Sequence, residues 1–145
     1  MPNNPRYWTQ EFIDKYVKAL GSNPGFQKAA KSFKNRIVLV CYDTPDGVDA
    51  RAEYNINRGK VEVELRTEKA PSSSIRNEEF NKNSYLARTS APYGIWVKLD
   101  RGEMNVVQAI FSPAYKLDGS KLKIMANMPL FNAMNAVAAA VPKTY

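Results

Sequence analysis

Three consecutive segments near the middle of the chain have the spacing of neighbouring β-strands. Residues 36–43 are mostly apolar at successive positions, which is typical of a strand buried on both faces. Residues 50–57 and 60–67 instead alternate between apolar and polar side chains, as strands with one buried face do. The connections, residues 44–47 and 57–59, contain the Pro, Asp, Asn and Gly residues that favour tight turns. The pattern predicts an antiparallel meander.

Two amphipathic helices are predicted before the meander. Residues 7–20 place apolar side chains along one helical stripe, and Gly21 ends it. Asn23 and Pro24 supply an N-cap and a first-turn proline for a second, shorter helix. We expect both helices to pack on the sheet.

The second half of the chain mixes further helices and strands. Residues 70–83, with a proline and three serines, predict a long loop, and residues 85–89 predict a fourth strand. One helix is expected over residues 93–101, and Asn105 caps another. This order of elements, without an internal repeat or a linker, predicts one α+β domain spanning residues 1–145.

The C-terminal end is expected to add a last strand and a last helix. Residues 113–119 predict a loop, and residues 121–126 predict the fifth strand. Asn127 and Pro129 then begin the final helix. This helix is more apolar than a small soluble protein needs for packing alone.

The chain contains no histidine, which removes the commonest general base and most zinc or iron ligand sets. Neither usual spacing of a Gly-rich phosphate loop occurs, and no pair of carboxylates stands out. We therefore predict no enzymatic activity, no catalytic residues, no cofactor and no metal site. The single Cys41 lies in an apolar run, which predicts a buried, unreactive thiol and suits a reducing compartment.

The net charge of +7 is spread along the whole chain. Nucleic-acid binding needs a clustered basic stripe, and the interleaved acidic residues argue against one. Transient contact with an anionic membrane surface is an equally direct consequence of the charge. The chain has no run approaching ~18 apolar residues and no apolar segment near its start that resembles a secretory signal, so we expect a cytoplasmic protein.

Short motifs from about Trp96 onward are similar to those of a known family. They comprise Gly102, Met104 and Asn105, then Ala109 and Phe111, then residues 121–124, Asn127 and Met128. Together with the order of elements over nearly the whole chain, these motifs resemble the sterol carrier protein-2-like lipid-transfer domain family.

The resemblance implies a five-stranded, mostly antiparallel sheet covered by about five helices that enclose an apolar tunnel. It also implies an intracellular carrier that sequesters a fatty acid, acyl-CoA, sterol or phospholipid in an internal hydrophobic cavity. The stretches 70–83 and 113–119 are longer than in the family. We expect them to lie around the mouth of the tunnel.

Ten apolar residues of the last third are expected to line such a cavity. The middle helices contribute Trp96, Leu99, Met104, Val107, Ile110 and Phe111, and the last strand and helix contribute Met125, Met128, Phe131 and Met134. The flexible thioether of methionine suits a pocket that adapts to different ligands. Each residue taken singly also fits an ordinary core, and about half are expected to touch a cavity.

Two other classes of function remain open from the sequence. The first is a non-catalytic interaction or dimerisation module with a filled core. The second is an enzyme that acts on a lipid-like substrate without histidine, for which Tyr85, Arg88 and Lys98 lie near the expected tunnel. No spacing singles these three out as a catalytic set, and head-group anchoring or a solvated surface suits them better.

Overall fold

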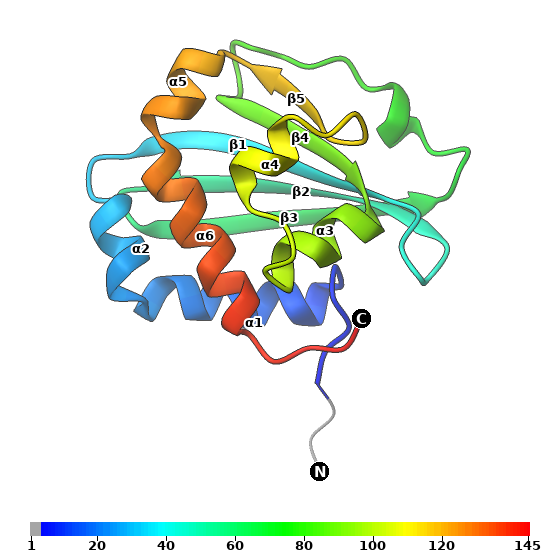
Figure 1. Ribbon diagram of the computed structural model, residues 1–145, viewed down its shortest axis with the longest axis horizontal. Coiled ribbons are helices and arrows are strands. Elements are labelled where there is room, and N and C mark those ends of the chain that lie inside the picture. The colour runs from blue at the N-terminus through cyan, green and yellow to red at the C-terminus, as the bar shows by residue number, and fades with distance from the viewer. Residues whose placement is uncertain (1–3) are drawn as a thin grey trace.

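A computed structural model of the protein describes residues 4–145 and contains six α-helices and five strands within that range (Figure 1). The helices are α1 (Gln10–Ser22), α2 (Pro24–Ala29), α3 (Tyr93–Asp100), α4 (Val106–Ile110), α5 (Lys121–Ala126) and α6 (Met128–Ala140). The strands are β1 (Lys34–Tyr42), β2 (Val48–Asn57), β3 (Lys60–Lys69), β4 (Ala87–Pro92) and β5 (Lys116–Gly119).

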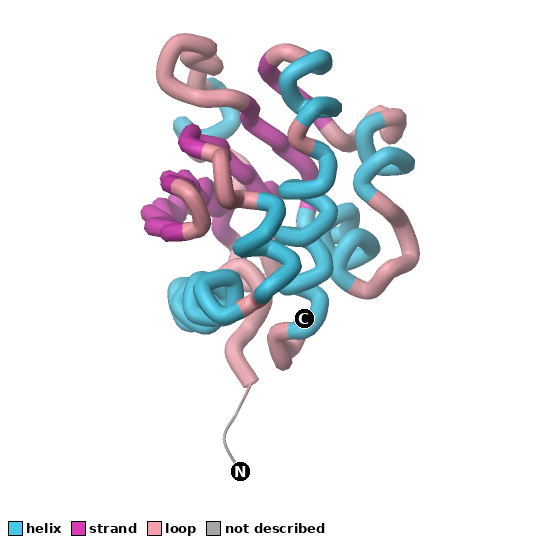
Figure 2. The backbone as a smooth tube through the Cα atoms, turned by 90° about the vertical axis from the view of Figure 1, so that its left-hand side faces the viewer, coloured by secondary structure: helices cyan, strands magenta, loops and turns pink. Residues whose placement is uncertain are grey.

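The five strands form one mixed sheet in the order β3-β2-β1-β4-β5. β1 pairs in parallel with β4, and the other neighbouring pairs are antiparallel. The α+β class, the meander and the mostly antiparallel sheet are therefore confirmed. Seen from the side, most of the helices lie on one side of the strands (Figure 2). The inward residues of β2, Ala52, Tyr54 and Ile56, join the main core on that side, as the alternation predicts.

Side-chain caps explain where several helices begin, two of them at the predicted residues Asn23 and Asn105. The Thr9 side chain accepts a hydrogen bond from the Phe12 amide at the start of α1, and Asn23 does the same for Phe26 in α2. Asn105 forms a reciprocal capping box with Gln108 in α4. Such caps satisfy amide groups that a helix cannot pair within itself.

The loop at residues 70–83 covers the opposite face of the sheet. Ile75, within a short 3₁₀ helix η1 (Ser74–Asn77), packs with Val38 and Val40 in a second apolar cluster. We expected this loop around the mouth of the tunnel; the structure instead packs its Ile75 on the face of the sheet opposite the main core. Side-chain alternation along β1 explains its position, because Val38 and Val40 point away from the main core and need a cover.

A buried carboxylate ties this loop to the sheet. Arg76 Nε lies 2.7 Å from Asp49 Oδ2, and the Ser73 hydroxyl and the Asp43 amide also donate to the Asp49 carboxylate. Burial by itself raises the pKa of Asp49, but these hydrogen bonds outweigh it and hold the pKa below its ordinary value. Both oxygens of the Asp49 carboxylate accept hydrogen bonds, so we assign this group of residues a structural role.

The stretch from 113 to 126 differs from the sequence prediction. Residues 116–119, expected in a loop, form β5, while residues 121–126, expected as a strand, form helix α5. The Ser120 side chain caps this helix by accepting from the Lys123 amide, and Lys, Leu, Met and Ala all favour helix. The alternation between lysine and apolar residues covers only residues 121–124, which is too short to outweigh these preferences. The fourth strand also begins later than predicted, at Ala87.

Gly119 is required where β5 ends. Its φ is 123°, and a Cβ added there meets the carbonyl oxygen of Leu86 at 2.5 Å. We expect Gly119→Ala to lower the free energy of unfolding by roughly 1–3 kcal/mol, measured by urea denaturation. Gly21→Ala in α1 is the control, because a Cβ there meets nothing within 4 Å. Equal unfolding midpoints for the two variants would contradict the prediction.

The C-terminal residues are held against the start of the chain. The amide of Thr144 donates to the carbonyl of Pro5, and the amide of Tyr7 donates to the carbonyl of Thr144. Lys143 Nζ lies 2.7 Å from Asp100 Oδ2, with side chains that are only 3% and 1% exposed. We call residues 143–145 the C-terminal latch.

Two further observations complete the fold. Within residues 4–145, no helix is both long and apolar enough to cross a bilayer. Cys41 is buried in the main core, and burial raises the pKa of its thiol far above the ordinary value. The thiol is therefore protonated and unreactive.

Candidate functional site

A partly enclosed apolar cavity lies between the sheet and the helices. The cavity has a volume of about 90 Å³ and is partly open to solvent. The N-terminal segment and α1 contribute Tyr7, Trp8, Phe12, Ile13 and Tyr16 to the wall; the sheet side contributes Ile37, Val38, Leu39, Tyr54, Ala87, Thr89, Tyr115 and Leu117; and the later helices contribute Trp96, Leu99, Val106, Ile110, Ile124, Phe131, Met134, Asn135 and Ala138.

The structure brings together five of the ten residues that the sequence proposed for a ligand site. They are Trp96, Leu99, Ile110, Phe131 and Met134. They come from α3, α4 and α6, and each side chain is buried or half-buried. Their contact with a ligand stays a prediction, but their common position on one wall is a property of the fold.

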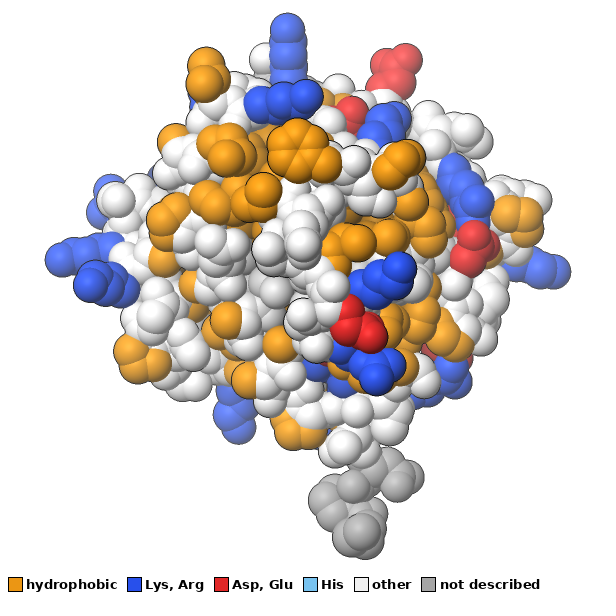
Figure 3. All heavy atoms as spheres, viewed as in Figure 1, with side chains coloured by type: hydrophobic (Ala, Val, Ile, Leu, Met, Phe, Trp, Pro, Cys, Tyr) orange, Lys and Arg blue, Asp and Glu red, His pale blue; other side chains and the backbone are white. Residues whose placement is uncertain are grey.

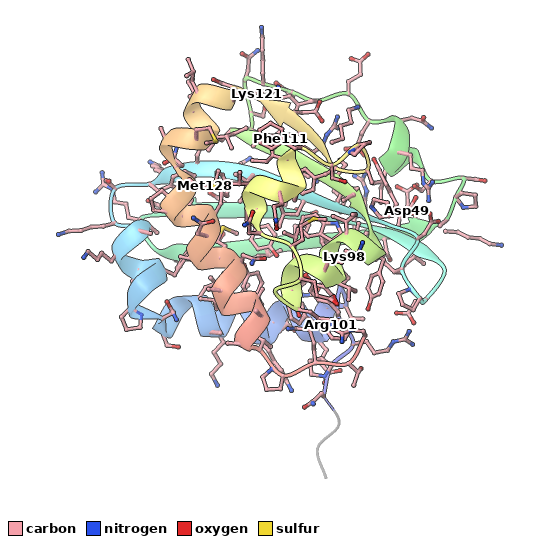
Figure 4. All side chains as sticks on the ribbon, viewed as in Figure 1. Asp49, Lys98, Arg101, Phe111, Lys121 and Met128 are labelled. Atoms are coloured by element: carbon pink, nitrogen blue, oxygen red, sulfur yellow. The ribbon has the colours of Figure 1, made fainter. Side chains whose placement is uncertain are left out.

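The other five lie outside the cavity wall. They are Met104, Val107, Phe111, Met125 and Met128. In α4, Val106 and Ile110 face the cavity, so Val107 and the C-cap residue Phe111 face solvent on the opposite side. Met125 is 53% exposed because helix α5 turns Ile124 inward instead. Met104 and Met128 are half-buried, and Figure 4 places Met128 where α5 meets α6.

The sequence prediction missed the N-terminal and sheet contributions to the wall. Trp8, Phe12 and Tyr16 lie on the helical stripe that the sequence did reveal, and Tyr54 lies on the inward face of β2. Both patterns identify side chains that face the interior. Neither shows which interior side chains border empty space.

Most polar groups of the wall are already bonded within the protein. The Trp96 indole donates to the carbonyls of Val40 and Ala91, and the Tyr16 hydroxyl donates to the carbonyl of Met134. Burial raises the pKa values of Tyr16 and Tyr54, so both phenols are neutral. The indole nitrogen of Trp8 is buried and has no partner among the described residues. The wall is thus apolar, uncharged and rich in aromatic rings.

The residues considered for catalysis do not meet at this cavity. The Tyr85 hydroxyl donates to Glu53, Arg88 pairs with Asp118 at 2.9 Å, and Lys98 is exposed on α3 (Figure 4). No group of metal-ligating side chains occurs within residues 4–145. The arrangement enclosed by the helices is suited to holding an apolar molecule.

Known proteins resemble this chain in structure and not detectably in sequence. No protein-family model matches it, and no curated protein gives a significant sequence match. A crystal structure of sterol carrier protein 2 has a TM-score of 0.73 at 12% identity, covering 94% of this chain and 100% of that one. The chain has the fold of sterol carrier protein 2.

Two further solved structures share the sterol carrier protein 2 fold with this chain. One is a conserved hypothetical protein of Thermus thermophilus, with a TM-score of 0.69 at 12% identity, covering 99% of this chain and 94% of that one. The other is the apo form of sterol carrier protein 2 from Yarrowia lipolytica, with a TM-score of 0.56 at 12% identity, covering 90% and 91%. The expected family resemblance is thereby confirmed at the level of the fold over nearly the whole chain.

Proposed function

We propose that this protein is a non-enzymatic intracellular carrier that takes up a fatty acid, acyl-CoA, sterol or phospholipid. The observation that carries the proposal is the uncharged, largely apolar cavity, in whose wall most polar groups are already bonded within the protein. Proteins of the same fold are named sterol carrier proteins. A reduced, unpaired Cys41 supports a cytoplasmic location.

The driving force for uptake is the removal of apolar ligand surface from water. Each buried methylene contributes about 0.8 kcal/mol, so about ten methylenes give roughly 8 kcal/mol before the costs of association. Trp96, Leu99, Ile110, Phe131 and Met134 are the proposed contact residues from the later helices. The unpartnered indole nitrogen of Trp8 is a donor for a ligand oxygen.

The open volume requires part of the wall to move when a long ligand enters. About 90 Å³ is several water volumes and too little for a complete acyl chain. Helices α4 and α5 are the proposed mobile part, because each has only one fully buried residue, Ala109 in α4 and Ile124 in α5. Elements with few buried apolar contacts open at low free energy.

A second candidate is the non-catalytic interaction module with a filled core. The small enclosed volume favours it, together with the edge-to-face contact of Trp8 and Trp96, whose ring centroids lie 5.1 Å apart. This contact fills part of the interior. On this alternative the remaining space is a packing defect without a ligand.

Solvent extraction and native mass spectrometry of the purified protein distinguish the two candidates. A carrier is expected to co-purify with lipid and, once delipidated, to take up a fluorescent fatty acid in vesicle-free buffer. A protein that carries no lipid and shows no uptake would overturn the carrier proposal and leave the module. Uptake should also slow hydrogen exchange in α4 and α5, because a bound ligand supports those helices.

A further inference from the structure

Helices α4 and α5 expose an apolar patch on the outer side of the cavity wall. Four of the five exposed large hydrophobic side chains among residues 4–145 belong to these helices or to the C-cap of α4. They are Val107 (46% exposed), Phe111 (81%), Leu122 (85%) and Met125 (53%), and we call them the α4–α5 patch. Figure 3 shows hydrophobic side chains gathered over α4 and α5 on this face. Contiguous exposed apolar groups of this kind mark interaction sites.

Lysines accompany the patch. Lys121 and Lys123 flank Leu122 in α5, and both are exposed. Neither forms an ion pair with any of the residues that the structure describes. Figure 4 shows Lys121 and Phe111 toward the same end of the molecule. The patch therefore combines apolar side chains with uncompensated positive charge.

We propose that the α4–α5 patch docks on an anionic phospholipid surface. Phe111, Leu122 and Met125 enter the interfacial region, while Lys121 and Lys123 contact the phosphate and carboxylate groups of the lipids. Helices α4 and α5 also form part of the cavity wall, so docking places that wall against the membrane. The use of this contact for lipid transfer rests on the carrier function proposed above.

The charge arrangement favours a membrane over a second copy of the chain. A two-fold dimer through the patch brings the same surface of both copies together. Lys121 and Lys123 of one copy then approach the same lysines of the other, and like charges at an interface are unfavourable. An anionic lipid surface complements these lysines instead.

Sedimentation with vesicles tests the inference. The protein is expected to pellet with phosphatidylcholine vesicles that contain phosphatidylserine, and much less with phosphatidylcholine alone. Lys121→Glu/Lys123→Glu is expected to weaken partitioning by at least about tenfold, and raised salt should act in the same direction. Leu122→Gln and Phe111→Gln, which replace exposed side chains, should each weaken partitioning about tenfold.

The control is Lys18→Glu/Lys31→Glu, which makes the same change in net charge on exposed residues near α1 and α2. If this control loses as much vesicle partitioning as Lys121→Glu/Lys123→Glu, the protein is attracted by its net charge alone, and the assignment of docking to the α4–α5 patch is overturned. Failure of the unaltered protein to pellet with vesicles also overturns the membrane-docking proposal. A dimer in gel filtration that Leu122→Gln dissociates overturns it as well, because it would assign the patch to a second copy of the chain.

A second measurement separates this inference from the carrier proposal. Fatty-acid uptake in vesicle-free buffer is expected to be unchanged in Lys121→Glu/Lys123→Glu, because neither lysine lines the cavity. Normal vesicle binding without uptake would refute the carrier proposal and leave the docking surface in place. Normal uptake without vesicle binding would refute the docking surface and leave the carrier proposal in place.

Discussion

Lys143→Met is expected to lower the free energy of unfolding by about 3–5 kcal/mol, because it leaves the buried Asp100 carboxylate without its cationic partner, with only the Tyr145 hydroxyl still donating to it. Lys143 Nζ bonds Asp100 Oδ2 and the carbonyl of Ala138, and it lies 5.5 Å from the ring centroids of Tyr7 and Phe12. The other oxygen of Asp100, Oδ1, is buried and has no partner among the described residues. Urea denaturation measures the effect, a large fraction of the ~5–15 kcal/mol that stabilises a typical domain.

Two controls give this prediction its specificity. Lys82→Met makes the same substitution at an exposed position and is expected to change stability by less than about 0.5 kcal/mol. The double variant Asp100→Leu/Lys143→Met removes both charges and should recover much of the loss, because no unpaired ion remains. A double variant as unstable as the sum of its single variants would contradict this account of the latch.

Ala138→Phe is expected to weaken fatty-acid binding by about tenfold or more. Ala138 lies on α6 at the cavity wall and is buried, so a phenyl ring there occupies the space proposed for the ligand. Titration of the delipidated protein with a fluorescent fatty acid measures the change. Overpacking is also expected to cost roughly 1–3 kcal/mol of stability, so circular dichroism should accompany the titration.

The neighbouring residue on the same helix provides a matched control. Ala139 is exposed, and Ala139→Phe adds the same ring on the solvent side of α6. Binding by this variant is expected to match that of the unaltered protein. If Ala138→Phe folds and binds as tightly as Ala139→Phe, the ligand does not occupy this cavity.

Sequence patterns were most informative about the site where they report burial directly. The stripe of α1 and the alternation of β2 point Phe12, Tyr16 and Tyr54 inward, and all three border the cavity. The five proposed residues that reach the cavity, such as Trp96 and Met134, also lie on inward helical faces. Their partners across the cavity are distant in sequence, so only the packed fold identifies the complete wall.

The sequence alone determined the α+β class, the meander and the helix starts at Asn23 and Asn105, because these depend on local periodicity and on caps a few residues long. The tertiary structure decided the rest. It made residues 116–119 a strand because β4 offers an edge for pairing, and it turned Phe111 and Met125 outward by setting the rotation of α4 and α5 against the sheet. Strand pairing and helix rotation depend on contacts between segments far apart in the chain, which no local pattern encodes.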